Sequence, residues 1–414
     1  MKKIFLFICF IAITYVLRAQ NIGINTSTPE AKLQIKGSED TSQLVIDANI
    51  VQNNLRPLIK LRNSSGVDLM WLHSDHPTNS FLGLNAGRVN NSTNAPNGMY
   101  NTFSGSGAGY SNTTGYQNTA NGYQALFLNS SGHVNTALGN GTLYSNTTGH
   151  FNTAIGAGAL GSNTSVSYNT AIGYAALAAN TVGIDNTANG AFALSSNTTG
   201  NENTAIGYQA LNTQSYNPGG GNWLSGNVAV GTRALFSNQP TSILNGIYNT
   251  AVGSSALRNN TTGAYNTANG YQALYSNIIG YYNTANGYQA LYSNITGYFN
   301  TANGYKALYS NTADYNTAIG YNALSANNTG TENTATGYNA LSANTTGFSN
   351  TAIGNNALYR NTQGSDNTAF GKEALSINTA GTFNTGLGVS AFASYAGSGL
   401  SFNHCDRNCI SSAR

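Results

Sequence analysis

The sequence predicts an all-β fold: a parallel β-solenoid, or β-roll, of about 18 coils with a small β module in front of it. Two observations support this class. An Asn-Thr pair returns every 17 residues over most of the 414-residue chain, and Ala, Gly and Leu return at fixed places behind it. Seventeen residues are too few for two helices and a turn, but they suit one coil of a narrow solenoid with two short strands.

Each unit, counted from its opening Asn as position 0, follows the pattern N-T-A-x-G-Y-x-A-L-x-S-N-T-T-G-x-x. We expect this repeat array to span residues 79–395. Longer steps of 24 and 22 residues lead to Asn227 and Asn249, and a short step of 16 residues leads to Asn316. The inserted residues contain Pro and Gly, so the irregular steps are expected at turns.

Leucine at position 8 is the expected core ladder, because it is the one bulky residue kept in nearly every unit. Burying one such side chain is worth ~1.5–3 kcal/mol. Small residues at positions 2 and 4 would let two walls approach closely, whereas position 3 accepts both Ile and Asn and is not expected in a deep core. Asn at positions 0 and 11 is expected at corners, with a left-handed backbone and with its amides stacked between coils. The expected ladder comprises Leu126, Leu143, Leu160, Leu177, Leu194, Leu211, Leu274, Leu291, Leu308, Leu324, Leu341, Leu358 and Leu375.

Residues 1–19 have the pattern of a secretory signal peptide. Two lysines precede the apolar run Ile4–Leu17, and the small residue Ala19 stands before the expected cut. No later stretch is apolar and long enough for a helix that spans a membrane, so none is expected after cleavage. The sequence therefore predicts a secreted chain.

The array is flanked by two segments of different character. In residues 20–78, short apolar bursts alternate with turn residues, which indicates four or five short strands. This module is interpreted as a cap for the first coil or as an attachment module, and both remain open. Residues 396–414 are interpreted as a C-terminal tail, and whether the chain is truncated there is left open.

Charge is scarce, at 7% of residues with a net charge of +3, and no basic patch predicts nucleic-acid binding. Asp185 and Glu202 share position 16 of successive units, and His133 and His150 share position 15. Each pair is interpreted as solvated surface rather than as a catalytic or metal site. We expect no catalytic residue, no metal and no cofactor.

Tyrosine at position 5 is the most functional-looking feature of the repeat. Exposed aromatic rings along a rod can pack subunits together or contact a ligand. The speculative ligand-binding residues are Tyr123, Tyr174, Tyr208, Tyr271, Tyr288, Tyr305, Tyr321 and Tyr338.

The pattern N-T-A-x-G-Y-x-A-L with N-T-T-G returns resembles the head repeats of trimeric autotransporter adhesins, the YadA-like β-roll. The opening Asn21–Thr26, followed by Pro29 and Ala31–Leu33, looks like the start of fibre-type secreted proteins of Gram-negative bacteria. The resemblance covers roughly residues 20–395. It implies a left-handed roll, a homotrimer, adhesion to host or matrix surfaces, and a location outside the cell or on its outer surface.

The leading hypothesis is thus a structural or adhesive fibre without enzymatic activity, which binds host, matrix or glycan surfaces. An ice-binding solenoid is the alternative, because Thr at position 1 supplies a regular row. A polysaccharide-acting β-helix enzyme is less favoured, because the array holds few acidic and basic groups. Monomer and trimer remain open.

Overall fold

The computed structural model describes residues 22–24, 33–35, 58–219, 223–393 and 403–406, and it describes side chains in residues 58–219 and 223–393. The expected signal peptide lies outside these residues. The chain divides into two units, Met1–Gln52 and Asn53–Arg414. In the first unit, strands β1 (Ile22–Ile24) and β2 (Leu33–Ile35) form a parallel pair.

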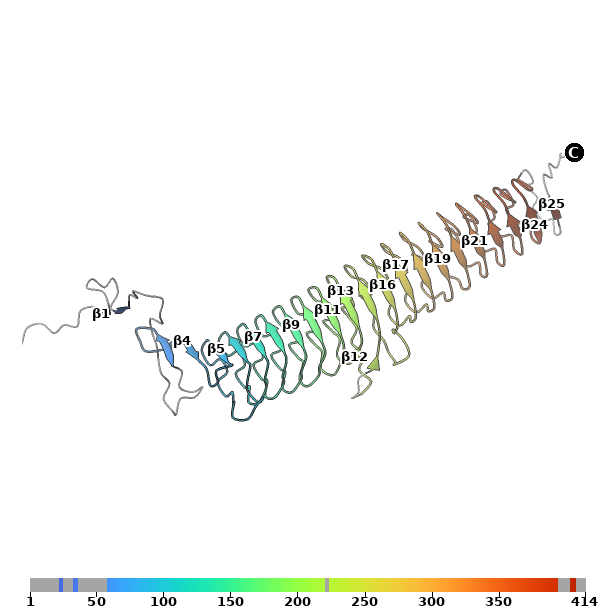
Figure 1. The fold of residues 1–414 in the computed structure, drawn as a ribbon. Coiled ribbons are helices and arrows are strands. Elements are labelled where there is room, and N and C mark those ends of the chain that lie inside the picture. The colour runs from blue at the N-terminus through green and yellow to red at the C-terminus, as the bar shows by residue number, and fades with distance from the viewer. Residues whose placement is uncertain (1–21, 25–32, 36–57, 220–222, 394–402, 407–414) are drawn as a thin grey trace, which may run out of the picture. The chain divides into compact units, whose positions relative to one another are not determined.

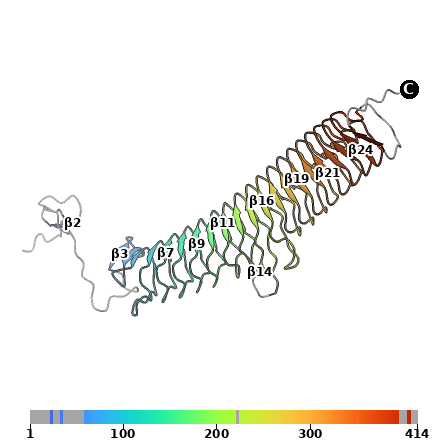
Figure 2. The ribbon, with the colours of Figure 1, turned by 45° about the vertical axis from the view of Figure 1, so that its right-hand side comes forward.

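The second unit contains the repeat array, a parallel β-solenoid of about 17 turns, which confirms the predicted fold class. Each coil contributes one short strand, and the strands of successive coils pair in register (Figures 1 and 2). The array strands are β5 (Ser80–Leu82), β6 (Thr102–Ser104), β7 (Thr119–Asn121), β8 (Thr136–Leu138), β9 (Thr153–Ile155), β10 (Thr170–Ile172), β11 (Thr187–Asn189), β13 (Thr204–Ile206), β15 (Val228–Val230), β16 (Thr250–Val252), β17 (Thr267–Asn269), β18 (Thr284–Asn286), β19 (Thr301–Asn303), β20 (Thr317–Ile319), β21 (Thr334–Thr336), β22 (Thr351–Ile353), β23 (Thr368–Phe370) and β24 (Asn384–Leu387).

The expectation of two strands per coil was wrong, because most coils hold a single strand of three residues. The rest of the coil turns through residues with a left-handed backbone at positions 6, 8 and 16. In one unit these are Gln124, Leu126 and Val134, with φ of 53°, 52° and 55°. Alternating left-handed residues cannot continue an extended strand, so the second wall is a chain of tight turns.

Glycine at position 4 serves a different purpose from the one expected. Gly122 has a φ of 143°, and a Cβ there would lie 2.3 Å from the carbonyl oxygen of Gly139 in the next coil. The residue is therefore needed for its backbone conformation and for close contact between successive coils. It does not bring the two walls of one coil together.

The core is a continuous cluster of Ala at positions 2 and 7 and Leu at position 8. Ala120, Ala125 and Leu126 each have 0% exposure, and the same pattern repeats coil by coil. All thirteen leucines of the expected ladder belong to this cluster. A single chain thus closes its own core, and position 3 lies outside it, since Ile206 is 40% exposed.

Two ladders of buried asparagine amides run beside the core, at positions 0 and 11. The Asn146 Nδ2 donates to Oδ1 of Asn129 one coil earlier at 2.8 Å and to the carbonyl of Gly149 at 3.0 Å. The backbone N–H of Asn152 donates to Oδ1 of Asn135 at 3.1 Å. Each such bond is worth ~0.5–1.5 kcal/mol net, and an unmet buried amide costs more. The expected amide stacking is present, but the expected left-handed backbone at these asparagines was wrong, because their neighbours at positions 6, 8 and 16 take it instead.

An antiparallel hairpin covers the first coil. Strands β3 (Ile59–Arg62) and β4 (Asp68–His73) pair with each other, and β4 pairs antiparallel with β5. Asp68 bonds Arg62 at 2.6 Å and Lys60 at 3.0 Å, and it accepts the indole N–H of Trp71 at 2.9 Å. These hydrogen bonds, that of Arg62 first, lower the pKa of Asp68 to about 2. At the other end, β25 (Asn403–Asp406) pairs parallel with β24.

The two long units insert loops that pack against each other on one side of the array. Strands β12 (Gly200–Asn201) and β14 (Trp223–Leu224) pair parallel at the base of the first insertion (Figures 1 and 2). Trp223, Ile247 and Ala264 form a small apolar cluster with Tyr216 against it. In the part of the chain that the structure describes, no helix is long and apolar enough to cross a membrane.

Candidate functional site

The strands turn two rows of side chains outward, at positions 1 and 3, because position 2 faces the core. Position 1 is an in-register row of threonines, in which Thr170 lies between Thr153 and Thr187. Val228 interrupts this row. Position 3 mixes exposed apolar side chains such as Ile206 with asparagines, so the outward face has one regular row and one irregular row.

The tyrosines expected at position 5 are all exposed, and five of them form a column, meaning rings stacked face to face in successive coils. Their ring centroids are 4.9–5.4 Å apart, and neighbouring planes lie within 17° of each other. The column comprises Tyr271, Tyr288, Tyr305, Tyr321 and Tyr338. Each inner ring is covered on both faces, so the column offers a surrounding ligand its edges and hydroxyl groups, and a bare face only at its ends.

The other three expected tyrosines stand apart from this column. Tyr174 and Tyr208 each meet Phe192 edge to face, at 5.2 and 6.5 Å between ring centroids. Tyr123 is 53% exposed, and the residues at its position in the next two coils are Asn140 and Ala157. The structure therefore brings together five of the eight sequence-predicted tyrosines as one feature.

Sequence reasoning missed further aromatic columns at positions 9, 15 and 16. Centroids in these columns are 4.9–5.5 Å apart. Position 16 holds Tyr248, Tyr265, Tyr282, Phe299 and Tyr315; position 9 holds Tyr275, Tyr292 and Tyr309; position 15 holds Tyr281 and Tyr298. Three columns pass through the units that open at Asn266, Asn283 and Asn300, so exposed aromatic rings gather there. The same 17-residue period that revealed position 5 would have found them.

Two cations of this region pack against the columns. The Arg258 guanidinium lies 5.8 Å from the centroid of Tyr275 and bonds its hydroxyl at 3.0 Å. The Lys306 ammonium lies 5.5 and 5.2 Å from the centroids of Tyr305 and Tyr309. These cation–π contacts place the charges against rings. Burial, and then the neighbouring phenols of Tyr275 and Tyr309, raise the pKa of Tyr292 above its ordinary value.

The charged and imidazole pairs weighed from the sequence lie on successive coils of the array. Asp185 and Glu202 are exposed on successive coils, and neither carboxylate has an ion-pair partner within the described residues. His133 and His150 stack at 4.7 Å, with Tyr116 on the other face of His133 at 4.6 Å. Residues 58–219 and 223–393 hold no group of three or more His, Cys, Asp or Glu that would bind a metal ion.

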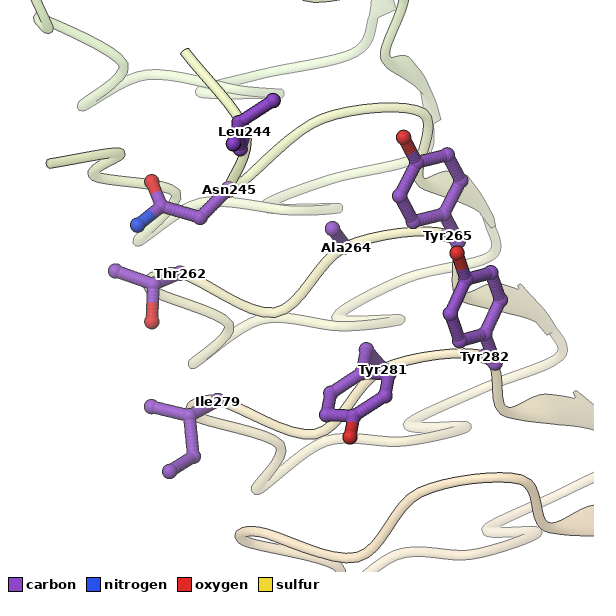
Figure 3. A pocket seen from close by; sticks show the side chains of 8 residues that line it. All are labelled: Leu244, Asn245, Thr262, Ala264, Tyr265, Ile279, Tyr281 and Tyr282. Carbon is purple, nitrogen blue, oxygen red and sulfur yellow. The ribbon is translucent and has the colours of Figure 1, made fainter. Parts of the chain in front are cut away.

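A hollow of about 310 Å³ interrupts the regular surface beside the second insertion. It is lined by Leu244, Asn245, Thr262, Ala264, Tyr265, Ile279, Tyr281 and Tyr282 (Figure 3). Position 15 is Ala264 in one coil and Tyr281 and Tyr298 in the next two. The preceding coil has Ile247 at this position, so the position-15 column begins at Tyr281, and the small side chain of Ala264 leaves the hollow open in front of it.

The comparisons with known proteins give no match. No protein-family model, no curated protein and no solved structure matches it. The class that fold and surface define is therefore a β-solenoid repeat protein with exposed aromatic columns, and the adhesin resemblance rests on the repeat pattern alone.

Proposed function

We propose that this chain is a structural, adhesive fibre protein of the cell surface or secreted space, without enzymatic activity. The observation that supports it is the gathering of exposed aromatic columns on a long array of low charge. Aromatic side chains supply large contact area at low entropic cost, and they are enriched where proteins bind other macromolecules. The proposed signal peptide, residues 1–19, would export the chain to the compartment where such contacts form.

Adhesion of the chain lacking residues 1–19 tests this function. Beads coated with the protein should bind surfaces carrying glycans or matrix proteins. Replacing the five position-5 column tyrosines by Thr should weaken the attachment, whereas the charge-removing pair Asp185→Asn and Glu202→Gln should leave it unchanged. Beads that bind no such surface would contradict the proposal.

We further propose that three chains associate, with position 3 in the contact. Exposed apolar side chains recur there, among them Ile155, Ile206 and Ile319 at 36%, 40% and 42% exposure. Because a single chain closes its own core, a monomer is expected to stay folded. Sedimentation equilibrium should give three times the chain mass, and Ile206→Asn with Ile319→Asn should shift it to the monomer. A wild-type monomer at all concentrations would exclude the trimer.

The threonine row favours ice binding as a second candidate function. Its hydroxyls repeat in register at the spacing of paired strands, about 4.8 Å. Thermal hysteresis of the wild-type chain, lost when Thr170, Thr187 and Thr204 are replaced by Lys, would support this reading. A freezing point equal to the melting point removes it.

A further inference from the structure

We infer that the hollow at Ala264 binds one uncharged sugar ring, which stacks on the face of Tyr281 that is turned toward Ala264 and so extends the position-15 column by one ring. The inference rests on the proposed adhesive function, because it names the class of surface molecule that the fibre contacts.

The geometry of the position-15 column provides the stacking surface. Tyr298 covers one face of Tyr281, with centroids 5.0 Å apart and planes at 7°. Toward the preceding coil stands Ala264, whose side chain ends at Cβ. Coils are about 4.8 Å apart, so a ring at the level of Ala264 would lie at stacking distance from Tyr281.

Neighbouring rings and the insertion loop enclose this place. Tyr265 and Tyr282 stack on each other at 4.9 Å and form one wall (Figure 3). Leu244 stands at the rim on the second insertion and is 75% exposed. Ala264 packs with Trp223 and Ile247 in the small apolar cluster, and these three residues are 6%, 5% and 3% exposed. The hollow is therefore lined by the second insertion and by the two coils that follow it.

The chemistry of the lining selects a neutral sugar. None of the eight lining residues, all within the described part of the chain, carries a charge. The lining combines the apolar ring of Tyr281 and the side chain of Ile279 with the hydroxyl groups of Thr262 and Tyr265 (Figure 3). A pyranose has the same division, because its C–H groups pack on the negative face of an aromatic ring while its hydroxyls meet polar groups at the edge. A volume of about 310 Å³ is at the small end of ligand sites, which span ~300–1,000 Å³, and suits one or two sugar units.

Among the rings that end a column, Tyr281 is distinguished by its place in the lining of the hollow. Inner rings of the columns are covered on both faces by their neighbours, as in the position-5 column. Tyr338 also ends a column, with Tyr321 on one face at 5.1 Å, but the hollow does not include it. It is 49% exposed, against 39% for Tyr281, and thus provides a matched control for a bare tyrosine face without an enclosed site.

The test uses residues 20–414 on an array of neutral glycans, ending in galactose, glucose, mannose or fucose, and of sialylated and sulfated glycans. The best neutral glycan is then titrated by calorimetry against the wild type, Tyr281→Ala, Ala264→Tyr and Tyr338→Ala. We expect wild-type binding to neutral glycans. Both hollow variants should lose about tenfold or more in affinity, and Tyr338→Ala should bind as the wild type does. Tyr281→Ala removes the stacking face, and Ala264→Tyr fills the hollow in front of it. If one variant fails to fold, the other still tests the site.

Binding to acidic glycans alone, equal binding by Ala264→Tyr, or equal loss in Tyr338→Ala would overturn the inference. Adhesion measured in parallel separates the two proposals. If the wild type adheres to glycan or matrix surfaces and the variants Ala264→Tyr and Tyr281→Ala adhere equally well, the adhesive function stands and the sugar site is excluded. A wild-type chain that binds no glycan and no matrix surface loses both.

Discussion

The first two coils and the regular coils that follow them fill the same core space, but they exchange the large and the small side chain between positions 2 and 8. Where the regular coils place Ala120 at position 2 and Leu126 at position 8, the coil of Asn101 places Phe103 at position 2 and Gly109 at position 8. A Cβ on Gly109 would lie 2.5 Å from the Phe103 ring, yet its φ of 58° is close to the 52° of Leu126. The backbone is thus a constant template, and what each coil conserves is the summed volume of the two positions.

The last unit reverses the exchange. Gly386 occupies position 2, and Phe392 occupies position 8 and packs partly buried against the core. In both versions, an aromatic ring at one of the two positions is paired with glycine at the other. Large rings therefore fill the core at the two ends of the array, and the Ala–Leu pair fills it in the coils between them.

The largest expected effect tests this exchange directly. Phe103→Ala should cost about 3–5 kcal/mol by leaving a cavity, and Gly109→Leu should cost about 1–3 kcal/mol or more by overpacking. The double variant recreates the Ala–Leu pair and should recover most of that loss. Its urea midpoint, followed by circular dichroism, should exceed the value expected from adding the two single changes. If the two losses in stability simply add in the double variant, the two positions do not exchange volume and the comparison between the coils is wrong.

A smaller effect is expected from the asparagine ladder within the regular coils. The Asn344 amide donates to Asn327 at 2.7 Å, and its oxygen accepts from Asn361 at 2.9 Å. The Asn294 amide donates to Asn277 at 2.9 Å, but its buried oxygen has no partner among the described residues. Asn344→Ala should therefore cost about 1 kcal/mol more than Asn294→Ala in the free energy of unfolding. Equal losses in urea unfolding would contradict a role for the ladder bonds.

The capping hairpin should loosen in acid before the regular coils do. The pKa of Asp68 is lowered to about 2, so its ion pairs stabilise the folded state fully above pH 3.8, and this contribution is lost as the pH falls from there through 2. Trp71 fluorescence should report the change, because its indole bonds Asp68. In Asp68→Asn, the same signal should no longer vary across that window, and an unchanged pH profile would exclude the carboxylate as its cause.

The smallest effect concerns a regular coil near neutral pH. Burial, and then the charge of His150, lower the pKa of His133 below its ordinary 6.5. Because His133 binds a proton more readily in the unfolded chain, its contribution to the free energy of unfolding should be complete above pH 6.5. This contribution should decline as the pH falls from there through the lower pKa of the folded state. His133→Tyr, which continues the column of Tyr116, should flatten this dependence between pH 7 and 5. A wild-type melting temperature that is constant over the range would contradict it.

The repeat period made the solenoid, the strand register and the buried Leu positions predictable, because each of them follows from spacing alone. The role of Gly122 was not predictable, because the atom that it approaches closely lies on the next coil and its φ is set by the turn. The second strand expected in each coil does not form, because left-handed residues at positions 6 and 8, such as Gln124 and Leu126, turn the chain. The hollow could not be predicted, because it depends on where the second insertion lies against the array and on Ala264 at a position that carries Tyr in the next two coils.

The asparagine ladder also divides the array mechanically. At position 11 it is interrupted twice within the described coils, after Asn163 and after Asn294, whose buried oxygens lack partners. Tension along the axis loads all coil-to-coil interfaces in series, so every interface bears the same force, and the one with fewest bonds parts first. Under axial load, we expect an array built this way to part first at one of these two interfaces, with the blocks of coils on either side left intact.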